Sequence, residues 1–167
     1  MMGSNSMEVN LSGKTALVTG ASSGIGAAVA TALAANGATV WVNHPDEATA
    51  ESAEAVVTSI SESGGAAQTI QADVSSESDV LAMFSTLGSG PLDILVNNAG
   101  IAHSSPVETL DVEDFDRLIG VHLRGTFLCT RSALKIMYAQ NSGRIINTAS
   151  QLAYIGAPGF SHYTAAK

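Results

Sequence analysis

Short apolar runs, rich in β-branched residues, alternate along the chain with longer, helix-like stretches. Five of these runs are almost continuously apolar, which is typical of strands that are covered on both faces of a sheet. They span residues 15–19, 38–43, 67–72, 92–97 and 144–148. The pattern predicts a sheet of short, mostly buried strands.

The segments between the strands have the length and composition of helices. They cover residues 25–36, 46–63, 77–87 and 112–139, with stops at Gly37, Gly64, Gly65 and Gly88. Strands that alternate with helices in this way form parallel sheets through right-handed crossovers. We therefore predict an α/β fold with a doubly wound parallel sheet in the strand order 3-2-1-4-5.

A chain of 167 residues, 46% of them hydrophobic, is the size of one domain with a proper core. We expect a flexible extension over residues 1–10 and one folded domain over residues 11–167. The last residue lies only a few positions into a helix that begins near Ser161, and the fifth strand has no further neighbour. We therefore expect a carboxy-terminal part of the fold to be missing from this sequence.

The charged residues are distributed unevenly. All fifteen acidic residues but only one base, Lys14, lie in residues 1–116, and the net charge is −8. No basic face for nucleic acid can be assembled from that part of the chain. Residues 15–45 carry no charge, but glycines and serines interrupt them, and their longest apolar run is about half the ~20 residues that span a bilayer. We expect neither a nucleic-acid partner nor a membrane partner.

Cys129 is the only cysteine. It has no partner for an intramolecular disulfide, and its neighbours provide no metal-ligand spacing. We therefore expect a buried, reduced thiol, no metal site and a cytoplasmic protein.

A glycine-rich turn, Thr-Gly-Ala-Ser-Ser-Gly-Ile-Gly, connects the first strand to the first helix. Gly20 permits a tight turn, Gly24 lets the backbone approach a phosphate, and Gly26 allows the helix to pack close to the sheet. Amides at a helix N-terminus attract anions, which makes this turn a candidate pyrophosphate site together with Ser22, Ser23 and Ile25. By itself, such a turn is also compatible with a tight connection that binds nothing.

The spacing of this turn resembles the signature of the short-chain dehydrogenase/reductase family. Three further motifs follow in the family's order: Asn-Asn-Ala-Gly at residues 97–100, Ser150, and Tyr-Thr-Ala-Ala-Lys at residues 163–167. The resemblance covers about residues 11–167 and implies a Rossmann-type fold. It also implies an oxidoreductase that interconverts a ketone and a secondary alcohol by hydride transfer with NAD or NADP. Glucose and other sugar dehydrogenases and 3-oxoacyl reductases are the nearest likenesses.

Tyr163 and Lys167 are four residues apart, which places them on the same face of a helix. A nearby cation favours the phenolate form of a tyrosine, so the pair is suited to proton transfer at neutral pH. The resemblance implies that Lys167 also binds the nicotinamide ribose and that Ser150, thirteen residues before Tyr163, orients the substrate carbonyl. Without the other motifs, Tyr-x-x-x-Lys would indicate an ordinary helix pair.

His122 stands where the family has a catalytic asparagine. The resemblance implies that its backbone carbonyl holds a water linked to Lys167, which is the interpretation we favour. Two alternatives remain: the imidazole itself takes part in the relay, or it packs under the site with its ring bonded to a neighbouring carbonyl. His103 and His162 are interpreted as ordinary polar residues.

The resemblance also implies adenine contacts from Asp73 and Val74 and ribose contacts from the backbone of Asn98, Ala99 and Gly100. Asp73 could instead cap the following helix, because Ser75 and Ser76 follow it. His44 occupies the end of the second strand, where an acid would select NAD, and no Arg or Lys lies nearby to bind a 2′-phosphate. We expect a preference for NAD over NADP.

The expected partners are a small carbonyl or alcohol substrate and further copies of the chain. The resemblance implies a homotetramer that pairs the long helix and the helix after it. If the natural chain ended at Lys167, a catalytically silent dinucleotide-binding or regulatory protein would be the alternative.

Overall fold

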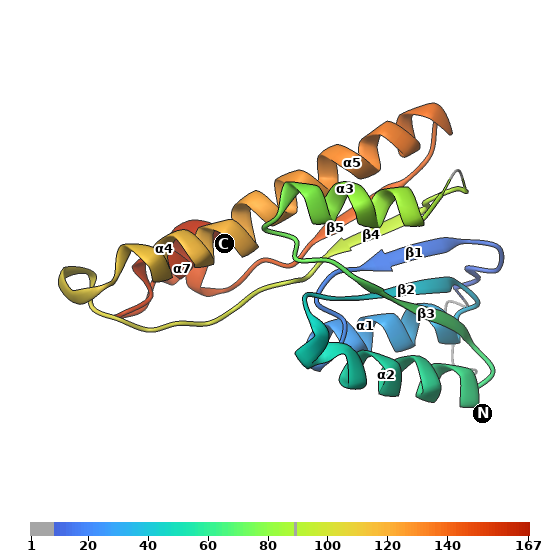
Figure 1. Ribbon diagram of the computed structural model, residues 1–167, viewed down its shortest axis with the longest axis horizontal. Coiled ribbons are helices and arrows are strands. Elements are labelled where there is room, and N and C mark those ends of the chain that lie inside the picture. Colours follow the sequence, from blue (N-terminus) through green and yellow to red (C-terminus); the bar gives the residue numbers. More distant parts are fainter. Residues whose placement is uncertain (1–8, 89) are drawn as a thin grey trace, which may run out of the picture.

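A parallel five-stranded sheet forms the centre of the computed structural model, which describes residues 9–88 and 90–167 (Figure 1). The strand order is β3-β2-β1-β4-β5, as predicted. Most of the expected extension over residues 1–10 lies outside the described residues. The strands are β1 (Thr15–Val18), β2 (Thr39–His44), β3 (Ala66–Gln71), β4 (Ile94–Asn97) and β5 (Arg144–Asn147). All five predicted strands are present, with ends that differ from the prediction by one or two residues.

Alternate residues of the central strand β1 face two separate hydrophobic cores. Ala16 and Val18 pack in the core under α1 (Gly24–Ala35) and α2 (Ala50–Glu62). Leu17 packs in the core under α3 (Glu77–Thr86) and α5 (Gly125–Ala139). These helix pairs cover opposite faces of the sheet (Figure 1). Because both faces are covered, every residue of β4 is buried, which explains its continuous apolar run. The edge strands β3 and β5 are mostly exposed or half-buried, so the prediction of mostly buried strands holds for the three inner strands only.

The predicted helix over residues 112–139 is not one regular α-helix. It consists of α4 (Val112–Ile119), a π-helical turn (Gly120–Arg124) and α5. The turn between β3 and α3 presses against this point, since a Cβ on Gly125 would lie 2.8 Å from Cγ2 of Val74. The Arg124 guanidinium also donates a hydrogen bond to the Ser75 carbonyl, 2.6 Å away. The π-helical turn, which is wider than an α-helical one, lies at this contact.

Short elements complete the structure; of these, only the helix that begins at Ser161 was predicted. The stretch expected as one helix over residues 46–63 begins with a 3₁₀ turn, η1 (Glu47–Thr49), which Asp46 caps. Another 3₁₀ turn, η2 (Val107–Thr109), follows β4, and α6 (Leu152–Ile155) precedes α7 (Ser161–Ala166). The helices α4 and α7 pack together beyond the carboxyl ends of the strands (Figure 1). None of the helices in the described part of the chain has the length and apolar character needed to cross a membrane.

Cys129 lies in the core between the sheet and α5, with no exposed surface. Its thiol is free, and burial raises its pKa to about 12. Both observations agree with the expected buried thiol. Since the thiolate is the reactive form, this thiol should be inert in the folded protein.

We predict that iodoacetamide at pH 8 leaves Cys129 unmodified in the native protein and modifies it completely in denaturant. Mass spectrometry of the intact chain would measure both reactions. Equal labelling rates in the two states would contradict the packing of α5 against the sheet.

Candidate active site

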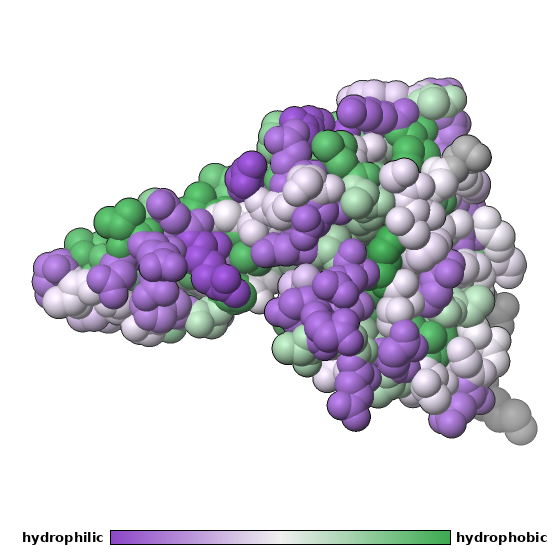
Figure 2. All heavy atoms as spheres, viewed as in Figure 1, coloured by the Kyte–Doolittle hydropathy of each residue, from purple (hydrophilic) through white to green (hydrophobic). Residues whose placement is uncertain are grey.

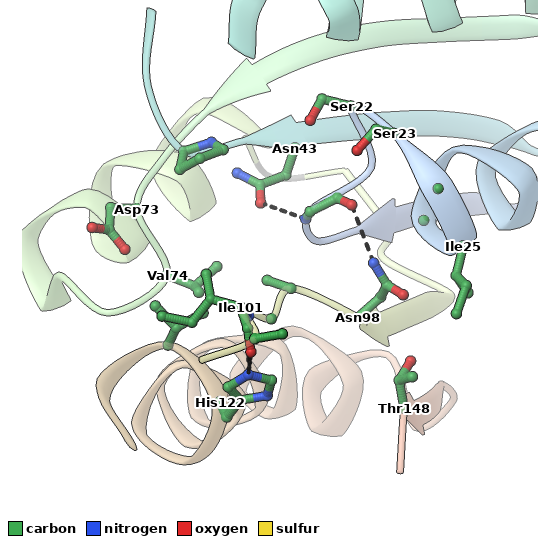
Figure 3. Close-up of a pocket in the computed structure, with 18 of the residues that line it drawn as sticks. Ser22, Ser23, Ile25, Asn43, Asp73, Val74, Asn98, Ile101, His122 and Thr148 are labelled. Atoms are coloured by element: carbon green, nitrogen blue, oxygen red, sulfur yellow. Dashed lines mark hydrogen bonds between the residues drawn. The ribbon is translucent and has the colours of Figure 1, made fainter. Parts of the chain in front are cut away.

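A cavity of about 710 Å³ lies at the carboxyl ends of the central strands. The glycine-rich turn forms one side of it, and Ile101 with His122 forms the opposite side (Figure 3). All four predicted catalytic residues line it: His122, Ser150, Tyr163 and Lys167. The predicted cofactor-binding residues that line it are Gly20, Ser22, Ser23, Gly24, Ile25, Gly26, Asp73, Val74, Asn98, Ala99 and Gly100. The fold thus brings together motifs that lie up to 147 residues apart, from Gly20 to Lys167.

The glycine-rich turn has no room for side chains where it meets the neighbouring strands. Gly20 has a φ of +61°, a conformation that favours glycine, and its Cβ would lie 2.8 Å from the Ala99 Cα. A Cβ on Gly26 would collide with the Gly20 carbonyl and the Asn98 amide. Glycines are therefore required here for the turn itself and for its packing against β4.

Side chains from two strands hold this turn in place (Figure 3). The Gly20 N–H donates to Oδ1 of Asn43 at 3.1 Å. Nδ2 of Asn98 donates to the carbonyls of Thr19 and Gly20, at 3.0 and 3.1 Å. In return, Oγ1 of Thr19 accepts the N–H groups of Asn98 and Ala99, each at 3.0 Å. Sequence reasoning missed Thr19 and Asn43, although polar residues at the ends of buried strands were an available signal.

Asp73 lines the cavity and also stabilises its own turn. Its carboxylate accepts hydrogen bonds from the N–H of Ser75 at 2.9 Å and from the Ser75 hydroxyl at 2.7 Å. Ser76 caps α3 by accepting the Asp79 N–H. Asp73 is therefore not the helix cap, which is Ser76, but it orders the turn before α3 and lies at the cavity, where an adenine contact stays a prediction.

His44 does not line the cavity, contrary to the position expected for it. Its ring is buried, with Nδ1 2.9 Å from the Asp46 carbonyl. The strand continues through His44, and the cavity is lined instead by Asn43, Pro45 and Asp46. Asp46 is the acid at this edge, and its carboxylate accepts hydrogen bonds from Thr49.

Lys167 and Tyr163 lie together as the four-residue spacing predicts. The Lys167 ammonium is 5.9 Å from the centroid of the Tyr163 ring and donates a 2.9 Å hydrogen bond to the Thr148 carbonyl. Burial lowers the pKa of Lys167 from its ordinary value. The rings of His122 and Phe160 contact Tyr163 edge-on, with centroids 5.4 and 6.1 Å away. The phenol is therefore held between two rings and a cation.

Ser150 follows β5 and lines the same cavity. Its hydroxyl oxygen accepts the Leu152 N–H at 3.2 Å at the start of α6. The hydroxyl hydrogen is left available for a carbonyl oxygen in the cavity. Ser150, Tyr163 and Lys167 therefore present an uncharged donor, a phenol and a cation to one space.

His122 lies in the π-helical turn and holds the backbone beside the cavity. Its Nε2 is 2.8 Å from the Ile101 carbonyl oxygen and 3.0 Å from the Ile101 nitrogen. A Cβ on Gly100 would lie 2.5 Å from the His122 ring, so the motif's last glycine allows this contact. Of the three interpretations, the geometry matches a ring bonded to a neighbouring carbonyl. The backbone carbonyl of His122 accepts the Gly125 N–H and retains a second lone pair.

Burial is the main cause of a lowered pKa for His122, and the charge of Lys167 lowers it further. The hydrogen bond to Ile101 acts in the opposite direction. The imidazole is therefore neutral at neutral pH. A neutral imidazole can form only one of the two hydrogen bonds with Ile101 in each tautomer. Nε2 either donates to the carbonyl or accepts from the N–H.

His103 and His162 lie next to each other outside the cavity lining. Their ring centroids are 5.6 Å apart, and Nε2 of His103 is 3.6 Å from Oδ2 of Asp114. Within residues 9–88 and 90–167, no group of three or more His, Cys, Asp or Glu is arranged to hold a metal ion.

Comparison with known proteins identifies the family. The family model described as short chain dehydrogenase matches residues 14–167. The chain belongs to this family. A 3-oxoacyl-[acyl-carrier-protein] reductase from Synechocystis is 44% identical over 159 residues, which are 94% of this chain and 64% of that protein. A reductase of the same name from Staphylococcus aureus is 42% identical over 156 residues, 92% of this chain and 63% of that protein.

A solved structure supports the same assignment. A protein from Agrobacterium tumefaciens, assigned provisionally as a gluconate dehydrogenase, superimposes with a TM-score of 0.89 at 35% identity. The alignment covers 95% of this chain and 62% of that one. This chain therefore spans less than two thirds of the length of these relatives. The expected family and fold are confirmed.

We predict that His122→Asn preserves the contact with Ile101. An amide side chain offers a donor and an acceptor at once, whereas one imidazole nitrogen offers only one of them. Urea unfolding at pH 7.5 should give a free energy within about 1 kcal/mol of the unaltered protein. His122→Ala, which leaves a cavity and removes the partner of Ile101, should cost about 2–3 kcal/mol.

The pH dependence provides the control for this prediction. Because the pKa of folded His122 lies below the unfolded value of ~6.5, the unfolded chain binds a proton that the folded chain excludes as the pH falls below ~6.5. His122 therefore reduces stability in acid. Between pH 7.5 and 5.5 the Asn variant should gain of order 1 kcal/mol over the unaltered protein. If the free energies of unfolding of the two proteins changed with pH in the same way, the folded imidazole would not be kept neutral.

Proposed function

We propose that the protein is an NAD(P)-dependent oxidoreductase that interconverts a ketone and a secondary alcohol. The observation that carries this proposal is that Ser150, Tyr163 and Lys167 line the same cavity as the glycine-rich turn. A nucleotide held by the turn and a substrate held by Ser150 would therefore meet in one space. The family membership and the names of the relatives support the same chemistry.

The residues present fit a dinucleotide. The turn is open toward the cavity at Gly24, where a Cβ would meet no atom within 4 Å, and it leads into the N-terminus of α1. Backbone amides at a helix N-terminus suit a pyrophosphate. Asp73, Val74 and residues 98–100 form the wall on which the adenosine part would lie. A bound nicotinamide ring would supply or accept the hydride.

The side chains have separable roles in this proposal. Tyr163 donates a proton to the forming alkoxide, or removes one from the alcohol in the reverse direction. Ser150 donates a hydrogen bond to the carbonyl oxygen and orients it. Lys167, which Thr148 holds, places a positive charge beside the phenol and stabilises negative charge there.

The choice between NAD and NADP depends on the charges at the end of β2. Asp46 lines the cavity there, and no Lys or Arg among the lining residues comes from β2 or η1. A 2′-phosphate beside Asp46 would meet a like charge, which favours NAD. The comparisons give this preference no support of their own, so it rests on Asp46 alone.

We also propose that the chain assembles with copies of itself. Large apolar side chains along α4, the π-helical turn and α5 are exposed, among them Val112, Leu123 and Phe127. Figure 2 shows apolar groups along the arm that α4 forms. Exposed apolar surface of this kind marks interfaces, and a homotetramer that pairs these helices would cover it. The buried, unpaired Cys129 supports a cytoplasmic location.

We predict that Tyr163→Phe keeps cofactor affinity and lowers kcat by about 10²-fold or more, because a positioned acid typically contributes ~10²–10⁴. Stopped-flow oxidation of NADH or NADPH with a small ketone panel, together with equilibrium binding, would measure both quantities. Tyr154→Phe is the matched control, since Tyr154 is 87% exposed and lies outside the cavity lining.

A loss smaller than about tenfold in Tyr163→Phe would reject tyrosine as the proton donor. Cofactor binding without turnover by the unaltered protein, over the whole panel, would favour a silent dinucleotide-binding protein instead.

We further predict a higher kcat/KM with NAD than with NADP. Asp46→Asn keeps an acceptor for Thr49 and removes the charge, so it should raise kcat/KM for NADP about threefold or more relative to NAD. An unaltered protein that prefers NADP by more than about tenfold would overturn the assignment of Asp46.

A further inference from the structure

Arg117 lines the cavity and is absent from every motif that the sequence suggested. It lies on α4, two residues before the end of that helix. Arg117 and Lys167 are the cations among the lining residues. Lys167 is bonded to Thr148 beside Tyr163, whereas Arg117 projects from α4.

The guanidinium of Arg117 has no hydrogen-bond or ion-pair partner among the described residues. The other arginines near it are engaged: Arg124 donates to the Ser75 carbonyl, and Arg131 pairs with Glu77. Asp114, on the same helix, faces His103. Arg117 is therefore free to contact a ligand from the rim of the cavity.

The packing of α4 determines which part of a ligand Arg117 can reach. The π-helical turn rests on the β3–α3 turn, where a Cβ on Gly120 would contact Ser75 and one on Gly125 would press on Val74. Val121, about one turn after Arg117, lines the cavity with it. The lining residues that these two turns and α4 contribute therefore include apolar Val74 and Val121 together with Asp73 and Arg117.

We propose that Arg117 binds the adenine base, with its guanidinium plane stacked on the purine. This inference rests on the proposed function, since it requires the cavity to take NAD(P). An apolar wall suits a flat base, and a planar guanidinium stacks on aromatic rings in a way that an ammonium does not. The ribose 2′ position belongs instead at the end of β2, beside Asp46. Arg117 thus contributes to affinity for either dinucleotide, and not to the choice between them.

The test compares equilibrium binding of NADH and NADPH, followed by nicotinamide fluorescence, in four forms of the protein. These are the unaltered protein, R117A, R117K and R131A. R131A is the matched control because it removes one positive charge from the neighbouring helix outside the cavity lining. We expect R117A to raise Kd about three- to fivefold for both dinucleotides alike, R117K to recover less than half of that loss, and R131A to bind as the unaltered protein does.

Each other outcome contradicts a defined part of the proposal. Unchanged binding by R117A would overturn the base contact and leave the proposed function standing. A loss confined to NADPH, or complete recovery in R117K, would show that the cation serves a phosphate instead. An equal rise in Kd for R131A would show that the effect comes from the loss of one positive charge and not from a contact with the base. No binding of either dinucleotide by the unaltered protein would overturn the proposed function, and the base contact with it.

Discussion

The arrangement of the site depends on the hydrogen bonds that join the ends of β1 and β4. Thr19 and Asn98 exchange bonds through both side chains and backbone, so the two strands leave the sheet at one fixed point. The chain after β1 must then turn sharply, which it does at Gly20, and the chain after β4 must run beneath that turn. The space between these two departures is the cavity. It lies at the position where doubly wound sheets bind ligands, since strand order reverses between β1 and β4.

The opposite wall is built by close packing at glycines. Gly125 admits Val74, Gly100 admits the ring of His122, and the π-helical turn lies between these contacts. Because His122 bonds to Ile101, the segment after β4 is attached to the helix that follows it. This contact joins the two segments that form the side of the cavity opposite the glycine-rich turn.

Three polar side chains that line the cavity also stabilise the local structure around them. Asp73 orders Ser75, Asp46 caps η1, and Ser150 accepts the N–H that begins α6, yet each also lines the cavity. A side chain that is already hydrogen-bonded to its own backbone loses little freedom when a ligand arrives. Short-range bonds thus preorganise these three side chains, while hydrogen bonds and packing between distant elements set the distances between the parts of the site.

The sequence by itself determined the elements and the local motifs. Continuous apolar runs identify strands buried on both faces, and the spacing of Tyr163 and Lys167 identifies a shared helix face, because both patterns depend on local geometry. Tertiary structure decided which side chains face the cavity. His44 turns away because β2 runs through it and its ring contacts the Asp46 carbonyl, and Arg117 lines the cavity because α4 packs against α7 at the carboxyl ends of the strands. The orientation of His44 follows from the course of its own strand, whereas the position of Arg117 depends on the packing of α4 against α7, which is distant in the chain.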